Sequence, residues 1–158
     1  MGCIIREIEK KDIPDIETIL ETSNSFSSEE IQCALEMIYT TLASQNDYRF
    51  LCCEKNNRVV GYTCYGPIPL TQGTFDLYWI CVNQEFQKHG VGKRLLHETE
   101  NKIINSNGRL VVIETSSDEK YRSAIKFYKK NNFSVASVIK DFYRDGEDKI
   151  IFIKNVKV

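Results

Sequence analysis

The sequence predicts an α/β protein of the layered α+β kind, with one mixed sheet of about seven strands flanked by four helices. Strand-like and helix-like runs of apolar residues follow one another along most of the chain. One helical run joins two strand-like runs as a crossover connection would, which predicts that those two strands are parallel neighbours. The 158 residues, of which 42% are hydrophobic, suffice for one core, so we expect a single domain over residues 1–158.

The first third of the chain predicts one strand and two helices. Ile4–Ile8 is a short apolar strand, and Asp12 ahead of Pro14 is placed to cap a helix that ends near residue 23. Ser27 or Ser28, followed by glutamates, opens a second helix. The apolar residues of this second helix recur at helical spacing: Ile31, Ala34, Leu35, Ile38 and Leu42.

The middle of the chain predicts three strands. Tyr48–Glu54 and Arg58–Tyr65 are joined by Asn56-Asn57, a pair that tolerates the positive φ of a tight hairpin, so we expect antiparallel neighbours. Thr74–Val82 is a third aromatic and β-branched run.

The second half predicts two helices and three strands. From Gly90 to about Asn105 the apolar positions recur at helical spacing, and Arg109–Thr115 is an apolar run typical of a strand buried on both faces. Tyr121–Asn131 is a short amphipathic helix. Two final strands, separated by an acidic turn, complete the order β-α-α-β-β-β-α-β-α-β-β: Phe133–Ile139 and Lys149–Lys154.

Composition argues against several classes of partner. The 21 basic and 22 acidic residues leave a net charge of −1, so we expect neither nucleic acid nor an anionic membrane as partner. No apolar run approaches the roughly 20 residues that span a bilayer, and the first residues do not resemble a signal peptide. We therefore expect a cytoplasmic protein.

The six cysteines predict reduced thiols rather than a metal site or disulfides. There is no Cys-x-x-Cys pair, and the two histidines, His89 and His97, form no ligand cluster, so we expect no metal. Adjacent Cys52 and Cys53 should point to opposite faces of a strand, which suits neither a shared metal nor a simple bridge.

A glycine-containing loop between a strand and a helix is the most informative segment. Gly90 and Gly92 stand where a helix begins, and free backbone N–H groups together with the helix dipole favour an anion such as a phosphate there. The neighbouring Lys88, His89 and Lys93, with Arg94, supply positive charge. Alternatively, the glycines only shape a turn. Neither a Walker loop nor a Rossmann motif fits this segment.

Gln87-x-x-Gly90-x-Gly92 resembles the acetyl-CoA motif of the GNAT superfamily of N-acetyltransferases. A second segment, Ala124–Phe133, is similar to the superfamily's Ala-x-x-Phe/Leu-Tyr-x-x-x-Gly-Phe helix, and the predicted element order is similar to the GNAT fold from Ile4 to Ile153. The resemblance implies splayed parallel strands 4 and 5, acetyl-CoA as cosubstrate and a primary amine as acceptor. Two positions depart from the pattern: Asn132 replaces the usual glycine, and Tyr121 replaces a common asparagine.

The resemblance also implies cofactor-binding residues. Backbone amides of the loop would hold the pyrophosphate, with Lys88 and Lys93 as charge support. Ile80 and Val82 would pair with pantetheine like an added strand, and the Val82 N–H would stabilise the oxyanion. The loop residues concerned are Gln87, Lys88, His89, Gly90, Val91, Gly92 and Lys93.

Tyr128 is the implied general acid toward the leaving thiolate, although a tyrosine packed in the core is the alternative. Asp76 is a candidate base because it lies six residues before Val82, on the same strand face by period two. Glu114 is a second candidate, and each carboxylate could instead cap a turn or pair with a lysine. Cys81 should point away from the thioester, which argues against an acyl-cysteine intermediate.

The acceptor should bind between the early helices, the loop Gly66–Gly73 and the final hairpin. The acidic turn Asp141–Asp148 either favours a cationic amine or is only solvated. Local loops or a partner subunit, as in a homodimer, would complete the pocket. Two further readings stay open: a non-catalytic CoA-binding or regulatory module, and a protein-interaction scaffold. Several aromatic residues would line the pocket or pack in the core: Tyr62, Tyr65, Tyr78, Trp79 and Tyr143.

Overall fold

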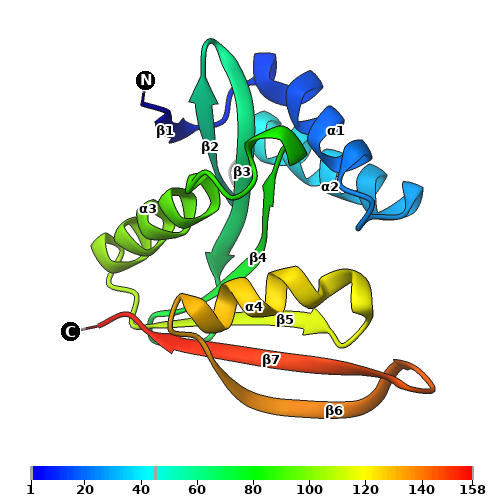
Figure 1. The fold of residues 1–158 in the computed structure, drawn as a ribbon. Coiled ribbons are helices and arrows are strands. Elements are labelled where there is room, and N and C mark those ends of the chain that lie inside the picture. The colour runs from blue at the N-terminus through cyan, green and yellow to red at the C-terminus, as the bar shows by residue number, and fades with distance from the viewer. Residues whose placement is uncertain (1, 45, 158) are drawn as a thin grey trace.

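The computed structural model describes residues 2–44 and 46–157, so Met1, Gln45 and Val158 of the predicted domain lie outside it. Its strands form one sheet in the order β1-β2-β3-β4-β5-β7-β6, in which only β4 and β5 pair in parallel (Figure 1). The strands are β1 (Ile4–Glu7), β2 (Arg49–Lys55), β3 (Arg58–Pro67), β4 (Thr74–Val82), β5 (Leu110–Ser116), β6 (Ser134–Arg144) and β7 (Glu147–Asn155). The α-helices are α1 (Ile13–Thr22), α2 (Ser28–Ala43), α3 (Val91–Asn105) and α4 (Arg122–Lys130). These elements confirm the predicted class, order and mixed sheet.

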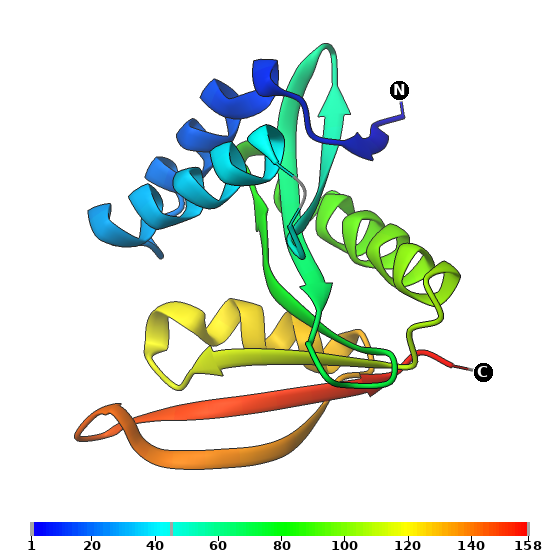
Figure 2. The ribbon, with the colours of Figure 1, turned by 180° about the vertical axis from the view of Figure 1, so that it is seen from behind.

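Helices cover the two faces of the sheet in pairs. Helices α1 and α2 lie on one face, and α3 lies on the other (Figures 1 and 2). Leu95 of α3 and Tyr128 of α4 belong to the same core cluster, whereas Ile16 of α1 packs in a second cluster. Cys52 and Cys53 lie in different clusters, which confirms that they point to opposite faces. None of the described helices has the length and apolar character needed to cross a bilayer.

The parallel strands β4 and β5 separate soon after they meet. Their pairing covers three positions and ends where Asp76 lies opposite Val112. Beyond this point β4 continues to Val82 and β5 to Ser116 in diverging directions (Figures 1 and 2). The splay that the resemblance implied is therefore present, and it opens a gap in the middle of the sheet.

A bulge in β4 overturns one prediction about Asp76. The pairing with β3 skips Tyr78, so Tyr78 and Trp79 both pack toward α1 and α2. Because the alternation restarts at the bulge, Val82 shares a face with Leu77 rather than with Asp76. The expectation that Asp76 and Val82 share a face by period two was wrong.

The strand β5 is covered on one face, whereas its apolar run predicted burial on both. Val111 and Ile113 are buried in the cluster that includes Tyr128 of α4. Glu114 points to the opposite face, and its side chain is half exposed. The prediction was wrong at Glu114, because α4 covers the other side of β5; Ser116, on the same face as Glu114, is buried.

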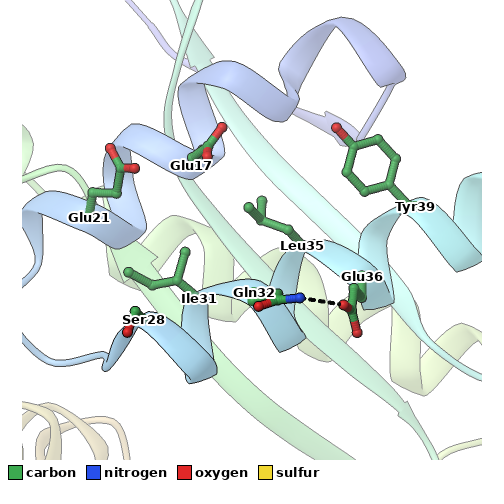
Figure 3. Close-up of a pocket in the computed structure, with 8 residues that line it drawn as sticks. All are labelled: Glu17, Glu21, Ser28, Ile31, Gln32, Leu35, Glu36 and Tyr39. Carbon is green, nitrogen blue, oxygen red and sulfur yellow. Dashed lines mark hydrogen bonds between the residues drawn. The ribbon is translucent and has the colours of Figure 1, made fainter.

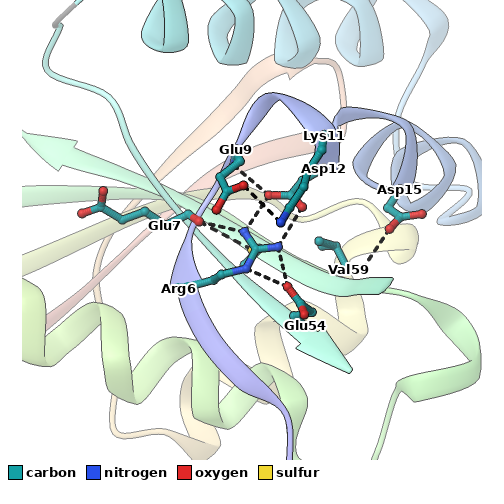
Figure 4. A network of polar contacts seen from close by, with 9 residues as sticks. Arg6, Glu7, Glu9, Lys11, Asp12, Asp15, Glu54 and Val59 are labelled. Carbon is teal, nitrogen blue, oxygen red and sulfur yellow. Dashed lines mark hydrogen bonds and ion pairs between the residues drawn. The ribbon is translucent and has the colours of Figure 1, made fainter. Parts of the chain in front are cut away.

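A buried ion network joins β1 to the segment before α1 and to β2 (Figure 4). Both terminal nitrogens of Arg6 donate to the carboxylate of Asp12 at 2.8 Å, and its Nε donates to Glu54 at 2.7 Å. Asp12 occupies the predicted cap position of α1, but its carboxylate accepts hydrogen bonds from Arg6 and from the Glu9 N–H instead of capping that helix. Ser27 caps α2 as predicted.

Candidate active site

The loop before α3 is held tightly against the end of β4. Gly90 adopts a positive φ of 83° immediately before the helix, a conformation that favours glycine. The Gln87 side-chain amide donates to the Val82 carbonyl at 3.1 Å, so the loop is fixed to β4 at this residue. The structure thus brings the loop residues Gln87–Lys93 together with Val82, as the sequence predicted.

The start of α3 presents unsatisfied backbone donors. The first backbone hydrogen bond of the helix runs from the Arg94 N–H to the Gly90 carbonyl at 3.0 Å, which leaves the preceding amides of the first turn free. Lys88, His89 and Lys93 are exposed around them. Arg94, however, donates to the carbonyl and the sulfur of Cys3, so its guanidinium is held against the segment before β1.

The free edge of β4 carries further donors. The Asn83 N–H donates to the Val60 carbonyl of β3 at 2.8 Å. Backbone groups alternate between the two edges of an antiparallel strand, so the N–H groups of Ile80 and Val82 point away from β3 and into the gap. Since β5 has diverged at this level, it does not pair with them.

Tyr128 lies in the core cluster on the sheet face that α4 covers. Its ring packs against Phe127, Phe133 and Phe152 at centroid distances of 5.8–6.0 Å. The described residues offer its hydroxyl no hydrogen bond, and none of their fully buried side-chain polar atoms lacks a partner, so this hydroxyl must touch solvent. Burial, and to a smaller extent the nearby Cys81, raises the pKa of Tyr128 above its ordinary value. The ring belongs to the core, as the alternative prediction stated, but the hydroxyl forms no hydrogen bond with the described residues.

The two candidate bases lie together on the opposite face, close to where β4 and β5 part. Burial and then the charge of Glu114 raise the pKa of Asp76 above its ordinary value. Glu114 is paired with Lys149, with 2.7 Å between Nζ and Oε2. The sequence did not point to Lys149, because its place beside Glu114 depends on the register between β5 and β7.

Cys81 points away from the gap into the cluster beneath α1 and α2. Burial raises the pKa of its thiol to about 12. A thiol that holds its proton at neutral pH is a poor nucleophile, which agrees with the expectation that this residue does not accept the acyl group.

The predicted acidic turn Asp141–Asp148 was too long, because all but residues 145–146 lie within β6 and β7, and its carboxylates make contacts within the hairpin. Asp148 accepts from Lys140 and from the Asp141 N–H, and Glu147 accepts from Ser116 and pairs with Arg144. These carboxylates therefore organise the hairpin, which leaves little free charge for an amine.

Most of the candidate pocket aromatics belong to the core. Tyr62 and Tyr65 are buried, and the Trp79 indole donates to the Tyr62 hydroxyl at 2.7 Å. Tyr78 lies beside Asp76, and Tyr143 is exposed on β6. Tyr78 is thus the half-buried member of this set at the face of Asp76, and Tyr143 is the exposed member at β6.

A shallow groove between α1 and α2 was not foreseen from the sequence. It has a volume of about 580 Å³, with Ile31 and Leu35 between the carboxylates of Glu17, Glu21 and Glu36 (Figure 3). The sequence contains one indication of this acidic surface, because residues 12–48 contain eight Asp or Glu and no Lys, Arg or His.

Comparison with known proteins identifies the family of the chain. The family model described as an acetyltransferase (GNAT) domain matches residues 46–135. A crystal structure from Desulfovibrio desulfuricans, assigned to the GNAT family of acetyltransferases, is 36% identical, covers 99% of this chain and 100% of its own, and superposes with a TM-score of 0.94. The chain belongs to the GNAT family of acetyltransferases. It is therefore an acyltransferase enzyme, of a family for which dependence on acetyl-CoA is typical.

More distant GNAT structures share the fold. The ribosomal-protein-S18-alanine N-acetyltransferase of Escherichia coli is 17% identical, with coverage of 99% of this chain and 95% of its own and a TM-score of 0.78. An aminoglycoside 6'-N-acetyltransferase complexed with coenzyme A is 13% identical, covers 98% of each chain and has the same TM-score. No curated protein sequence matches the chain.

Proposed function

We propose that this GNAT enzyme binds acetyl-CoA in the gap between β4 and β5 and transfers the acetyl group to a primary amine by direct attack in a ternary complex. One arrangement carries the proposal. The gap has free amides of α3 at one end, unpaired N–H groups of Ile80 and Val82 along its edge, Tyr128 on one face and two carboxylates on the other.

The chain's backbone would provide most of the cosubstrate binding. Amides from Gln87 to Gly92 would hold the pyrophosphate at the positive end of α3, with Lys88 and Lys93 nearby. The free edge of β4 would pair with the pantetheine amides like an additional strand. Lys88 and Lys93 are exposed, so we assign them a supporting rather than an orienting role.

The position of the loop refines which N–H meets the thioester. Val82 lies at the base of the loop, where the Gln87 side chain holds its carbonyl. An arm that descends from the loop would pass Val82 first, and its reactive end would lie farther along β4. We therefore propose that the N–H of Ile80, as well as that of Val82, polarises the thioester carbonyl, whereas the family resemblance implied Val82 alone.

Side chains on opposite faces of the sheet would carry out the two proton transfers. An amine attacks only in its neutral form, so Asp76 or Glu114 would remove its proton on the α1–α2 face, directly or through water. Tyr128 would protonate the leaving thiolate from the α4 face. A phenol is protonated at neutral pH at its ordinary pKa of about 10, as a donor requires, and burial raises the pKa of Tyr128 further.

Calorimetry with acetyl-CoA tests the binding assignment. A Cβ on Gly92 would make ordinary contacts, 3.4 Å to Phe127 and 3.7 Å to Val82, so Gly92→Ala should fold and bind. Gly92→Glu should weaken binding by about 100-fold, because its carboxylate would lie among the amides meant for phosphate. Equal affinity of the parent and Gly92→Glu would show that the loop does not hold the cosubstrate.

A further inference from the structure

Three charged side chains lie in a row on the sheet face opposite α3 and α4. They are Asp76 of β4, Glu114 of β5 and Lys149 of β7, and each alternates with neighbours that pack in the α3–α4 core. Asp76 lies opposite Val112, two residues before Glu114. Lys149 lies opposite Ser116, two residues after Glu114. The row therefore extends diagonally across three strands from the point where the gap opens.

Lys149 is held from two sides. Its Nζ lies 2.7 Å from Oε2 of Glu114 and 4.5 Å from the ring centroid of Phe142. Only 16% of its side chain is exposed, whereas the side chain of Lys140 in the nearby pair with Asp148 is 78% exposed. Lys149 is thus a fixed cation rather than a mobile surface lysine.

The ion pair separates the roles of the two carboxylates. Glu114 would have to give up its contact with Lys149 in order to accept a proton and move. Asp76 forms no ion pair with any of the described residues, and it lies closer to the closed end of the gap. It is therefore the carboxylate that is free to receive a proton.

We infer that Lys149 is a positioning residue of the transfer reaction: it pins Glu114, and Asp76 takes the proton from the acceptor amine. This inference rests on the proposed function and deepens it, because it names the base and the residue that selects it.

The groups that face Asp76 determine how it titrates. They are Glu114 of β5, Tyr78 of β4 and Lys149 of β7. Burial and then Glu114 raise the pKa of Asp76, while Tyr78 and Lys149 lower it. Without Lys149 the charge of Glu114 is uncompensated, so the pKa of Asp76 should rise further and the base should be protonated up to a higher pH.

Titration of the Asp76 carboxyl by carbon-13 NMR in the full chain provides the first test. Lys149→Met should raise the titration midpoint by about half a pH unit, and Lys149→Arg should restore it. Glu114→Gln should lower the midpoint, because it removes the like charge. Thermal melting checks folding; a merely structural lysine would change the melting temperature and leave the midpoint where it was.

Steady-state kinetics with acetyl-CoA and a responsive amine provide the second test. Asp76→Asn should lower kcat by about 100-fold, and Glu114→Gln should keep most of it. Lys149→Met should move the acidic limb of the kcat profile to higher pH by the same half unit, lower kcat by at most about threefold on that limb and leave the KM for acetyl-CoA unchanged. Lys149→Arg should behave as the parent.

Two results would overturn the inference. One is an Asp76 titration midpoint that is the same in Lys149→Met as in the parent chain. The other is a Glu114→Gln variant whose kcat is as low as that of Asp76→Asn. Failure of the proposed function looks different. A folded parent chain that acetylates no amine would contradict the function itself, while the NMR titration would still report whether Lys149 acts on Asp76.

Discussion

Tyr128 is a core residue to which we also assign a catalytic role. Its ring is part of the aromatic cluster under α4, yet its hydroxyl has no hydrogen-bond partner among the described residues. A buried phenol normally finds a partner, so this hydroxyl adds no hydrogen bond to the stability of the core and is available for the proton transfer that we propose.

Replacing Tyr128 with phenylalanine separates these roles. The ring contacts remain, so the melting temperature should change little and acetyl-CoA affinity should be retained, while kcat should fall by about 100-fold because the proton donor is lost. Calorimetry and a turnover assay measure the two effects. Unchanged turnover would remove Tyr128 from the mechanism.

At the residue scale, motif positions were predictable and side-chain partners were not. The left-handed backbone at Asn132, with φ of 69°, shows why asparagine can replace the usual glycine of the motif, since asparagine tolerates this conformation. By contrast, the bulge at Tyr78 places Asp76 and Val82 on opposite faces of β4, although period-two alternation predicted the same face. A bulge depends on strand pairing, and the aromatic run around it contains no glycine or proline to mark it.

At the scale of elements, the Arg6 network determines how β1 and α1 attach to the sheet. The side chain of Asp12 is 4% exposed and that of Arg6 is 21% exposed, so removal of either charge leaves the other poorly solvated. Burial alone would raise the pKa of Asp12, but the hydrogen bonds from Arg6 and from the Glu9 N–H outweigh it and hold this pKa below its ordinary value.

Arg6→Met should lower the free energy of unfolding by about 2–3 kcal/mol, because it leaves the buried Asp12 carboxylate without its ion-pair partner. Urea unfolding at neutral pH measures this. Arg122→Met is the matched control, since the Arg122–Glu119 pair is exposed and its loss should leave the urea midpoint unchanged. Equal effects of the two variants would contradict the assigned role of the network.

The same network predicts a pH dependence of stability. Because the folded-state pKa of Asp12 is lowered, its stabilisation is present above about pH 4 and is lost as the pH falls through the lowered value. The Arg6→Met chain should lose less stability over that acidic range than the parent. Urea midpoints that fall in parallel for the two chains would rule this out.

At the scale of the whole molecule, a near-neutral total conceals a separation of charge. Residues 12–48 carry eight carboxylates and no basic residue, and the whole chain carries −1, so the remaining residues carry a net charge of +7. Arg6 and Arg58 neutralise Asp12 and Asp15, but Glu17, Glu21 and Glu36 line the α1–α2 groove without an ion pair among the described residues.

This separation predicts a preference for cationic acceptors, since α1 and α2 lie on the face that carries Asp76 and Glu114. The KM for a dicationic amine should rise about three- to tenfold when salt increases from low concentration to about 0.5 M. A triple Glu17→Gln, Glu21→Gln, Glu36→Gln variant should raise the same KM at low salt and leave that for acetyl-CoA unchanged. A salt response identical in parent and variant would show that the groove carboxylates play no part.

The fold was more predictable than the acceptor side of the site. Hydrophobic periodicity and the crossover helix sufficed for the element order, and the glycine loop marked the start of α3. The acceptor side that we propose uses residues of the successive strands β4, β5 and β7, such as Asp76, Glu114 and Lys149, that are distant in sequence. Their proximity depends on register, and local pattern does not specify register.

Mass spectrometry after incubation with acetyl-CoA labelled with carbon-13 in its acetyl group, together with a panel of amines, tests the central claim most directly. Direct attack predicts labelled acetyl on at least one amine and none on the cysteines of the chain, at a rate that Gly92→Glu and Tyr128→Phe both reduce. A folded chain that labels no amine, or a label that passes through a cysteine, would contradict the account.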